Sequence, residues 1–387
     1  MHARSIVSPD DQRVTFVELF FDLVFVFAVT QVVQVLHDGF GWGAVGRAVL
    51  VFWLVWWAWT QFTWALNAAD TTHHMVELAT LLAVAVAFFM AVAVPDAFRG
   101  RALWFAVPYV MVRTVGLTLY GRVAEEAHPS QLAAVRTFCL VSLGGLAAVV
   151  MGAVAGGTTQ YWAWGLAILL DVIAAGVGGR LEGWDLHPEH FAERHGLIVI
   201  IALGESLIVA AGGLVGVPWD VHLAAVAVLA VAVTCAFWWS YFPVAKPELD
   251  HALASARGRA QSMLARDVYS LTHFPLLCGV VAYAASVEEA VAHPSAALPL
   301  EWRAALAAGL ALFVGGMAAA TWRCRHRVLW ARLIVSTGTA LAIVLVALPP
   351  LGSLAIAFAG IATIATLEQR GWLAGRAEVG VPEASGG

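Results

Sequence analysis

Two carboxylates interrupt the first long apolar stretch of the chain. Glu18 and Asp22 are four residues apart, so they lie on one face of this segment if it is helical. Glu205 lies in the middle of another apolar stretch and is followed directly by Ser206. Because a charge at the centre of a bilayer costs a few kcal/mol, such residues need an oppositely charged partner or a wet cavity. The pattern predicts either a polar pathway or a set of internal ion pairs.

Other polar residues interrupt further apolar stretches. The candidates for a transport or polar pathway, besides Glu18, Asp22 and Glu205, are Gln31, Glu77, Arg113, Arg136, Asp171, Glu193, Arg194, His195, Ser206, His273 and Arg332. We expect Arg113, Arg136 and Arg332 to be counter-charges for the acidic groups. We expect Glu18 and His195 to lie at the cytoplasmic mouth of the path. The alternative is a structural role, in which these residues form ion pairs that fix helix packing and no ion or solute is transported.

Histidines in two polar segments raise the question of a metal site. Imidazole and carboxylate groups are zinc ligands, but the spacing of these histidines matches no established metal motif. A solvated, charged loop and a helix start are the alternative interpretations. The metal-ligand candidates are His73, His74, His187 and His190.

The elements that hold these residues follow from composition. Hydrophobic residues make up 61% of the 387-residue chain and charged residues 12%, and the mean hydropathy is +0.81. Globular domains average roughly 45–50% apolar and about 25% charged residues. The apolar residues form successive blocks long enough to cross a bilayer as helices, and lipid forbids unpaired backbone groups. The chain is therefore predicted to be an all-α, polytopic membrane bundle, with the lipid bilayer as its main partner.

Turn residues divide the chain into about twelve predicted membrane spans. Pro349 and Pro350, for example, separate the last two. The predicted spans are 16–37, 45–66, 77–95, 102–121, 131–154, 159–177, 195–214, 220–242, 266–286, 302–320, 328–347 and 350–367.

The distribution of basic residues orients this bundle. If both termini are cytoplasmic, fourteen arginine and lysine residues fall on the cytoplasmic side and four, Arg47, Arg99, Arg101 and Arg303, fall outside. This bias is the one that cytoplasmic loops carry. It predicts a multi-pass protein of the bacterial cytoplasmic (inner) membrane with both termini cytoplasmic.

Similar residues recur along the chain and predict two parallel six-helix repeats. Residues 56–59 (Trp-Trp-Ala-Trp) and 238–241 (Trp-Trp-Ser-Tyr) are 182 positions apart. Glu77 with His273, and Arg136 with Arg332, share a second offset of 196. The predicted parts are a first repeat at 1–180, a cytoplasmic inter-repeat loop at 181–194, a second repeat at 195–370 and a flexible tail at 371–387.

Several chemistries have no support in the sequence. The chain lacks HExxH, GxSxG and P-loop motifs, and its single lysine, Lys246, falls in a predicted loop. We therefore expect a protein that is not an enzyme, with no cofactor and no nucleic-acid partner. The sequence leaves a homo-oligomer open.

Two stretches carry a resemblance to a known family. Residues 13–31, with Glu18, Asp22 and Gln31, and residues 190–206, with Glu193 and Glu205, resemble signatures of the bacterial low temperature requirement protein A (LtrA) family. The resemblance covers nearly the whole chain. It implies a multi-pass membrane protein linked to growth in the cold, and it supplies no molecular mechanism.

A fainter similarity concerns the first helix alone. Residues 20–30 look like the Phe-Ser-Asp signature of a six-helix potassium-channel family, with Phe20 and Asp22 matching and Phe21 in place of the serine. This similarity implies that Asp22 belongs to a polar network near a pore.

The leading hypothesis is translocation of an ion, such as a monovalent cation, or a small solute along a path that Asp22 and Glu205 line or brace. The alternatives are a metal-dependent membrane enzyme that uses His187, His190 and its neighbours, and a non-transporting membrane stress protein.

Overall fold

The computed structural model describes residues 5–9, 12–37, 39, 41–127, 129–178, 186–215 and 220–378. Within these ranges the chain is almost entirely helical, and the one β contact is an isolated antiparallel bridge between Val7 and Ala69. Arg180 and residues 181–185 of the predicted inter-repeat loop, and residues 379–387 of the predicted tail, lie outside the described residues.

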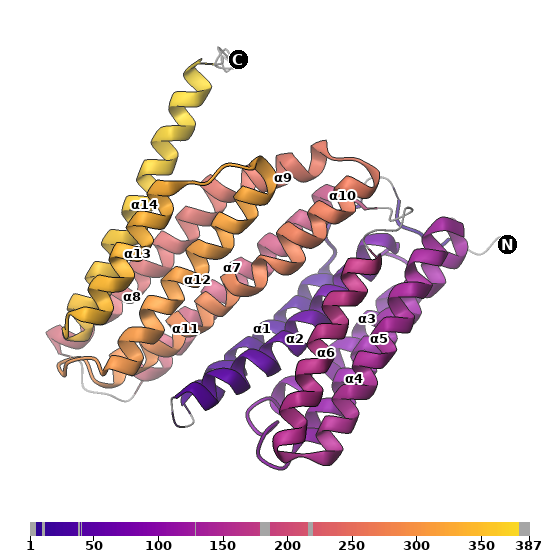
Figure 1. The fold of residues 1–387 in the computed structure, drawn as a ribbon, viewed down its shortest axis with the longest axis horizontal. Coiled ribbons are helices and arrows are strands. Elements are labelled where there is room, and N and C mark those ends of the chain that lie inside the picture. Colours follow the sequence, from indigo (N-terminus) through magenta and orange to yellow (C-terminus); the bar gives the residue numbers. More distant parts are fainter. Residues whose placement is uncertain are drawn as a thin grey trace.

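The helices form two groups that lie side by side (Figure 1). The N-terminal group consists of α1 (Phe16–His37), α2 (Trp42–Ala68), α3 (His74–Val92), α4 (Ala102–Glu126), α5 (Pro129–Ala155) and α6 (Gly157–Gly178). The C-terminal group consists of α7 (Pro188–Leu214), α8 (Val221–Trp239), η1 (Ser240–Ala245), α9 (Lys246–Ser255), α10 (Gly258–Leu264), η2 (Ala265–Leu271), α11 (His273–Ala292), α12 (Leu300–Arg325), α13 (Trp330–Leu345) and α14 (Pro350–Glu378).

Length and hydropathy identify the membrane-crossing helices. Over the described part of the chain, eleven helices are long and apolar enough to span a bilayer, and α13 is a shorter apolar helix of 16 residues. These helices confirm the predicted polytopic bundle. Large apolar side chains such as Phe88, Phe89, Trp104 and Leu140 are exposed on its outside. Because the hydrocarbon core of a bilayer contains no water, exposed side chains on membrane-crossing helices face lipid.

Two helices are much longer than predicted. Residues 221–255 and 258–292 each form a continuous 35-residue helical unit, and each contains a π-helical segment, η1 or η2. At 1.5 Å per residue each unit is about 52 Å long, so both extend beyond a hydrocarbon core about 30 Å thick. The predicted spans 220–242 and 266–286 leave residues 243–265 between them as an expected loop, and most of these residues are instead helical. Lys246 therefore lies in helix α9.

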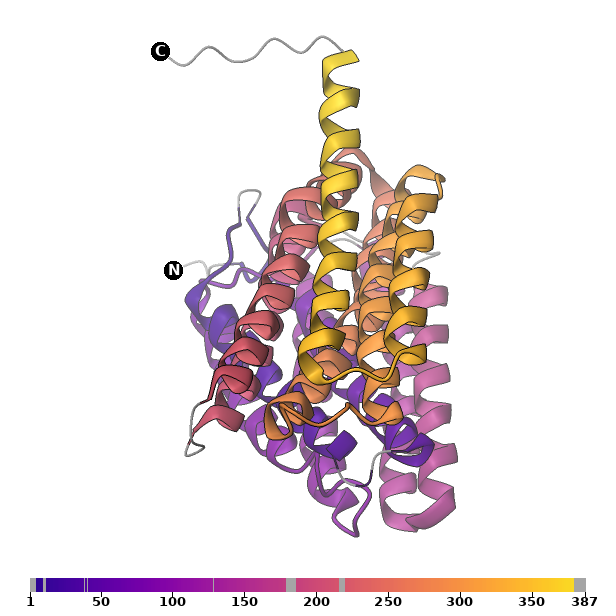
Figure 2. The ribbon, with the colours of Figure 1, turned by 90° about the vertical axis from the view of Figure 1, so that its left-hand side faces the viewer.

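The segment predicted to be an inter-repeat loop, residues 181–194, is partly helical. Helix α7 begins at Pro188, so residues 188–194 are helical. Proline is favoured in the first turn of a helix because its missing N–H group would have no helical partner there. At the other end of the chain, α14 continues to Glu378 and rises beyond its neighbours (Figure 2).

Hydrogen bonds tie the connections together at each end of the bundle. On the side where α1 begins, here called the N-terminal side, the amide of Asp70 donates to Ile6 O and the hydroxyl of Ser5 donates to Glu126. On the opposite side, the amide of Leu298 donates to the carbonyl of Leu348. Successive helices therefore cross the bundle in alternating directions.

Small residues allow a close contact between helices α11 and α12. A Cβ added to Gly279 would lie 2.6 Å from Gly309 O, and a Cβ added to Gly309 would lie 3.0 Å from Gly279 O. Small residues at such crossings are typical of membrane helices, because association there depends on close van der Waals packing.

Candidate functional site

Helices α1 and α7 lie side by side and connect the two helix groups. Glu18 contacts His190, Asp22 contacts Arg194, and Thr30 donates a hydrogen bond of 2.9 Å to Glu205. The partners are separated by 172 to 175 residues throughout. The nearly constant separation means that α1 and α7 run in the same direction.

Four ionisable side chains form a buried cluster on these two helices, here called the boundary cluster: Glu18, Asp22, His190 and Arg194. Each is at most 1% exposed. His190 Nε2 is 3.0 Å from Glu18 Oε1, and Arg194 Nη1 is 3.4 Å from the same oxygen. Arg194 Nη2 also donates to Asp22 Oδ1. The guanidinium is thus shared between two carboxyl groups that lie one helical turn apart on α1.

Side chains of α1 and α2 complete the surroundings of the boundary cluster. The indole of Trp59 donates to Asp22 Oδ1 at 2.7 Å. The guanidinium carbon of Arg194 lies 5.9 Å from the ring centre of Phe21 and 5.7 Å from that of Trp59, within the range of cation–π attraction. Asn67 donates to His190 Nδ1 at 3.0 Å. The cluster therefore has aromatic and amide neighbours and no open contact with solvent.

The partner of Asp22 is therefore Arg194, and the expected counter-charges lie elsewhere. Arg113, on α4, is fully buried and pairs with Asp171 of α6 at 3.2 Å. Arg332, on α13, pairs with Glu368 of α14. Arg136 is exposed on α5.

The remaining pathway candidates occupy several environments. Glu205 and Gln31 are half-buried, whereas Ser206 is buried and donates to Leu203 O at 2.7 Å. Glu77 lies in the first turn of α3, 4.0 Å from the exposed His74. Glu193 is exposed. Glu18 and His195, expected at the mouth of a path, are both fully buried.

His195 and His273 belong to an aromatic cluster of the C-terminal group. His273 Nε2 is 2.7 Å from the hydroxyl of Tyr241 in η1, and its ring stacks on Tyr269 in η2 at 5.3 Å. The ring of His195 lies 5.2 Å from that of Tyr269. Asp250 accepts from Tyr269 at 2.8 Å and pairs with Lys246 at 2.5 Å. π-Helical turns are frequent at functional sites, and here both carry a member of this cluster.

The metal-ligand candidates do not converge. His190 contacts Glu18, His187 hydrogen-bonds through its backbone to Asn67, and His73 caps α3 by accepting from the amide of Met75. Among the residues with described positions, no group of three or more histidine, cysteine, aspartate or glutamate side chains could hold a metal ion.

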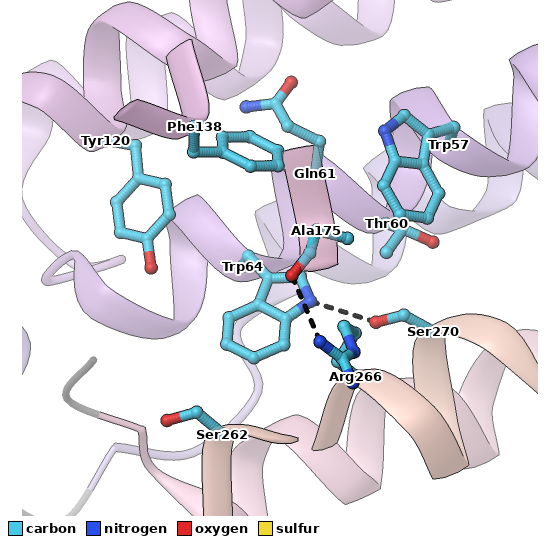
Figure 3. A pocket seen from close by; sticks show the side chains of 10 residues that line it. All are labelled: Trp57, Thr60, Gln61, Trp64, Tyr120, Phe138, Ala175, Ser262, Arg266 and Ser270. Atoms are coloured by element: carbon cyan, nitrogen blue, oxygen red, sulfur yellow. Dashed lines mark hydrogen bonds between the residues drawn. The ribbon is translucent and has the colours of Figure 1, made fainter. Parts of the chain in front are cut away.

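A small cavity of about 40 Å³ lies between the two helix groups toward the N-terminal side (Figure 3). Its walls come from α2, α4, α5 and α6 on one side and from α10 and η2 on the other: Trp57, Thr60, Gln61, Trp64, Tyr120, Phe138, Ala175, Ser262, Arg266 and Ser270. Two contacts cross the gap. Trp64 donates to Ser270 Oγ at 3.0 Å, and Arg266 donates to Ala175 O at 3.3 Å.

A larger cavity of about 460 Å³ lies between the groups toward the opposite side. Residues of α1 and α2 face residues of α11 and α12 across it, and the lining is apolar apart from Glu301 near the start of α12. Trp42 and Leu300, at the helix ends that border it, are 93% and 55% exposed. This cavity therefore reaches the end of the bundle.

Aromatic rings separate the two cavities. Phe52 lines the larger cavity and Trp57 lines the smaller one, and five residues of α2 correspond to about 7.5 Å along its axis. Between them, Phe274 of α11 lies 5.3 Å from Phe52 and 4.8 Å from Trp53, which stacks on Trp57 at 5.5 Å. These four side chains are here called the aromatic barrier. Three come from α2 and one from across the boundary.

Sequence reasoning missed several partners of the buried charges. Asn67, Trp59 and Tyr241 are uncharged, so a search for charges inside apolar segments does not find them. Glu368 lies one residue beyond the last predicted span. The offset of 196 that relates Arg136 to Arg332 would place a counterpart of Asp171 next to Glu368, so this signal was present in the sequence.

The helices, their lipid-facing surface and the buried charges together define a multi-pass helical membrane protein. The family model of the bacterial low temperature requirement A protein (LtrA) matches residues 13–366. The chain therefore belongs to the LtrA family. The potassium-channel similarity of the first helix receives no support from this match.

Similar proteins include an uncharacterized protein of Rhizobium meliloti (strain 1021). It is 30% identical over 332 residues, which cover 79% of this chain and 76% of the relative. No solved structure matches the chain.

Proposed function

We propose that the protein translocates a small solute along the boundary between its two helix groups. The observation that carries this proposal is the pair of cavities on that boundary, which lie toward opposite sides of the bundle and are separated by the aromatic barrier. Translocation sites in membrane transporters commonly lie near the midplane between two structural repeats. In the conformation described, the barrier blocks the path.

The lining of the cavities favours one class of solute. The smaller cavity offers four aromatic rings with hydroxyl and amide groups, and the larger one is apolar apart from Glu301. An inorganic cation would find few oxygen ligands to replace its water in the larger cavity, and in the smaller cavity it would meet the positive charge of Arg266. We therefore propose a small organic solute with a largely apolar surface and a few hydrogen-bonding groups.

The proposed movement is a rocking of two repeats, and the packing of helices supports such repeats. Helix α1 packs on α3 as α7 packs on α11, α3 on α4 as α11 on α12, and α5 on α6 as α13 on α14. Helix α2 also contacts α6 as α8 contacts α14. These equivalent neighbours support two parallel six-helix repeats, approximately residues 1–180 and 195–370, with both termini on the cytoplasmic side of the inner membrane.

A substitution in the aromatic barrier tests the path. Phe274→Ala removes the one ring that the C-terminal group contributes, so the two cavities should join. Proteoliposomes that hold this variant should leak glycerol and ethanolamine at least several-fold faster than wild-type vesicles, with a smaller change for K⁺ and Na⁺. Phe88→Ala is the matched control, because Phe88 is 46% exposed on the lipid-facing side of α3. Leak rates that are equal in the three proteins for every probe would contradict the path.

The family description adds a proposed physiological link, a requirement for this protein at low temperature. A strain without the protein should then grow more slowly in the cold, and the wild-type chain should restore growth. Equal growth of both strains at every temperature would remove this link without affecting the proposed path.

A further inference from the structure

Three buried ion-pair sites among the described residues differ in their balance of charge. Arg113 pairs with Asp171, and Arg332 pairs with Glu368, so each of these sites has one cation for one carboxylate. The boundary cluster instead places two carboxyl groups, Glu18 and Asp22, around the single guanidinium of Arg194. It is balanced only if a second positive charge or a bound proton is present.

Hydrogen bonds show that His190 does not supply this charge. The amide of His187 donates to Asn67 Oδ1 at 3.0 Å, which fixes the orientation of the Asn67 side chain. Its Nδ2 group also donates to His187 O at 3.0 Å, and the same group faces His190 Nδ1. Because Nδ2 is a donor, His190 Nδ1 is an acceptor and carries no proton. His190 is therefore a neutral imidazole that donates from Nε2 to Glu18.

The other titratable groups on the helices around the cluster do not balance it either. His195, on α7, directs Nδ1 to the carbonyl of Phe191, and its Nε2 has no hydrogen-bond partner in the described structure. Helix α2 contributes the uncharged Trp59 and Asn67. Titratable groups on neighbouring elements have other partners: His74 lies near Glu77 on α3, Lys246 pairs with Asp250 on α9, Arg266 pairs with Asp267 in η2, and Tyr269 and His273 belong to the aromatic cluster. Glu193, on α7, is exposed.

We propose that the boundary cluster is a proton-binding site and that Asp22 holds the proton on Oδ2. Glu18 Oε2 accepts three hydrogen bonds, from the amide and hydroxyl of Thr15 and from His190. Glu18 Oε1 makes no hydrogen bond of good geometry, but it lies 3.0 Å from His190 Nε2 and 3.4 Å from Arg194 Nη1. Asp22 accepts hydrogen bonds at Oδ1, whereas its Oδ2 is buried and has no partner among the described residues. In a fully buried site, a neutral carboxylic acid is far less costly than an unbalanced carboxylate.

This site also indicates how protons could enter the cycle. The cation of the cluster belongs to α7 and both carboxyl groups belong to α1, so separation of the two helices admits water to Asp22. The proton then passes from Oδ2 to water on the N-terminal side, because the cluster lies near the start of α1 on that side. Each opening and closing of the boundary would release and rebind one proton. This second step rests on the proposed translocation, whereas the bound proton does not.

Infrared spectroscopy of purified protein at neutral pH tests the bound proton directly. The wild-type spectrum should contain a carbonyl band of a protonated carboxylic acid, and aspartate labelled with ¹³C in its side-chain carboxyl should shift that band. The band should disappear in Asp22→Asn. It should remain in Asp171→Asn, the matched control. Asp171 Oδ2 is also buried without a hydrogen-bond partner among the described residues, but Arg113 balances the charge of this carboxylate.

The outcomes separate the two parts of the proposal. A wild-type spectrum without an aspartic acid band would overturn the proton site, and this result needs no variant to fold. A band that persists in folded Asp22→Asn would overturn the assignment to Asp22. A band that behaves as expected, together with ethanolamine uptake that an imposed pH gradient accelerates in the wild type and not in Asp22→Asn, would support both steps. Uptake that does not depend on the pH gradient would refute the coupling of proton release to transport, without contradicting the proton site.

Discussion

Removal of the shared cation gives a quantitative test of what the boundary cluster contributes. Arg194→Gln leaves a shorter side chain whose amide group can donate hydrogen bonds but carries no charge. Glu18 would then keep a buried carboxylate without a cation, since His190 is neutral. Removing one partner of a buried ion pair costs about 3–5 kcal/mol, and this figure includes the desolvated charge that remains. The cation–π contacts with Phe21 and Trp59 disappear as well.

Thermal unfolding in detergent measures this cost. For a unit of about 150–250 residues, the size of each helix group, 1 kcal/mol corresponds to roughly 2–4 °C, so the unfolding midpoint should fall by about 6–20 °C. Arg136→Gln is the matched control, because Arg136 is exposed and surface substitutions usually change stability by no more than about 0.5 kcal/mol. Equal midpoints for the two variants would refute the reasoning. Glu18→Gln added to Arg194→Gln should recover part of the loss, because it removes the unpaired charge.

Two further substitutions test the cavities and the helix packing. Ala308→Trp places an indole in the larger cavity, so adding it to Phe274→Ala should reverse the glycerol leak. Ala85→Trp, on the exposed face of α3, is the control and should leave the leak of Phe274→Ala unchanged. A leak that persists in both double variants would contradict a path through this cavity. Gly279→Ala should destabilise the protein by about 1–3 kcal/mol, because its Cβ would overlap the backbone of α12, while Gly315→Ala meets nothing within 4 Å and should leave the thermal midpoint unchanged.

Most of the membrane-crossing helices could be predicted because the bilayer imposes a simple rule on them. A segment that crosses it must be long and apolar, and turn residues such as Pro349 and Pro350 mark its ends. The rule fails where a helix leaves the membrane. Lys246 to Ser255 form a polar helix, and their hydropathy resembles that of a loop.

The sequence predicted which residues belong to the candidate site, but not which of these residues pair with one another. Glu18, Asp22 and Arg194 stand out because each is a charge within an apolar helix. Which charges meet depends on which helices are neighbours, and the order of helices in space is not contained in hydropathy. Arg113 therefore looked like a partner for Asp22, whereas the packing of α4, α5 and α6 brings it to Asp171.

The position of Lys246 has a practical consequence for measuring motion. As the single lysine of the chain, it is the one side-chain target for amine-reactive reagents. It is 19% exposed, it pairs with Asp250, and its methylene groups lie against Gly196 of α7. Acylation of this amine should accelerate when α9 moves away from α7. The labelling rate of the native, unsubstituted protein would then report on opening of the C-terminal group.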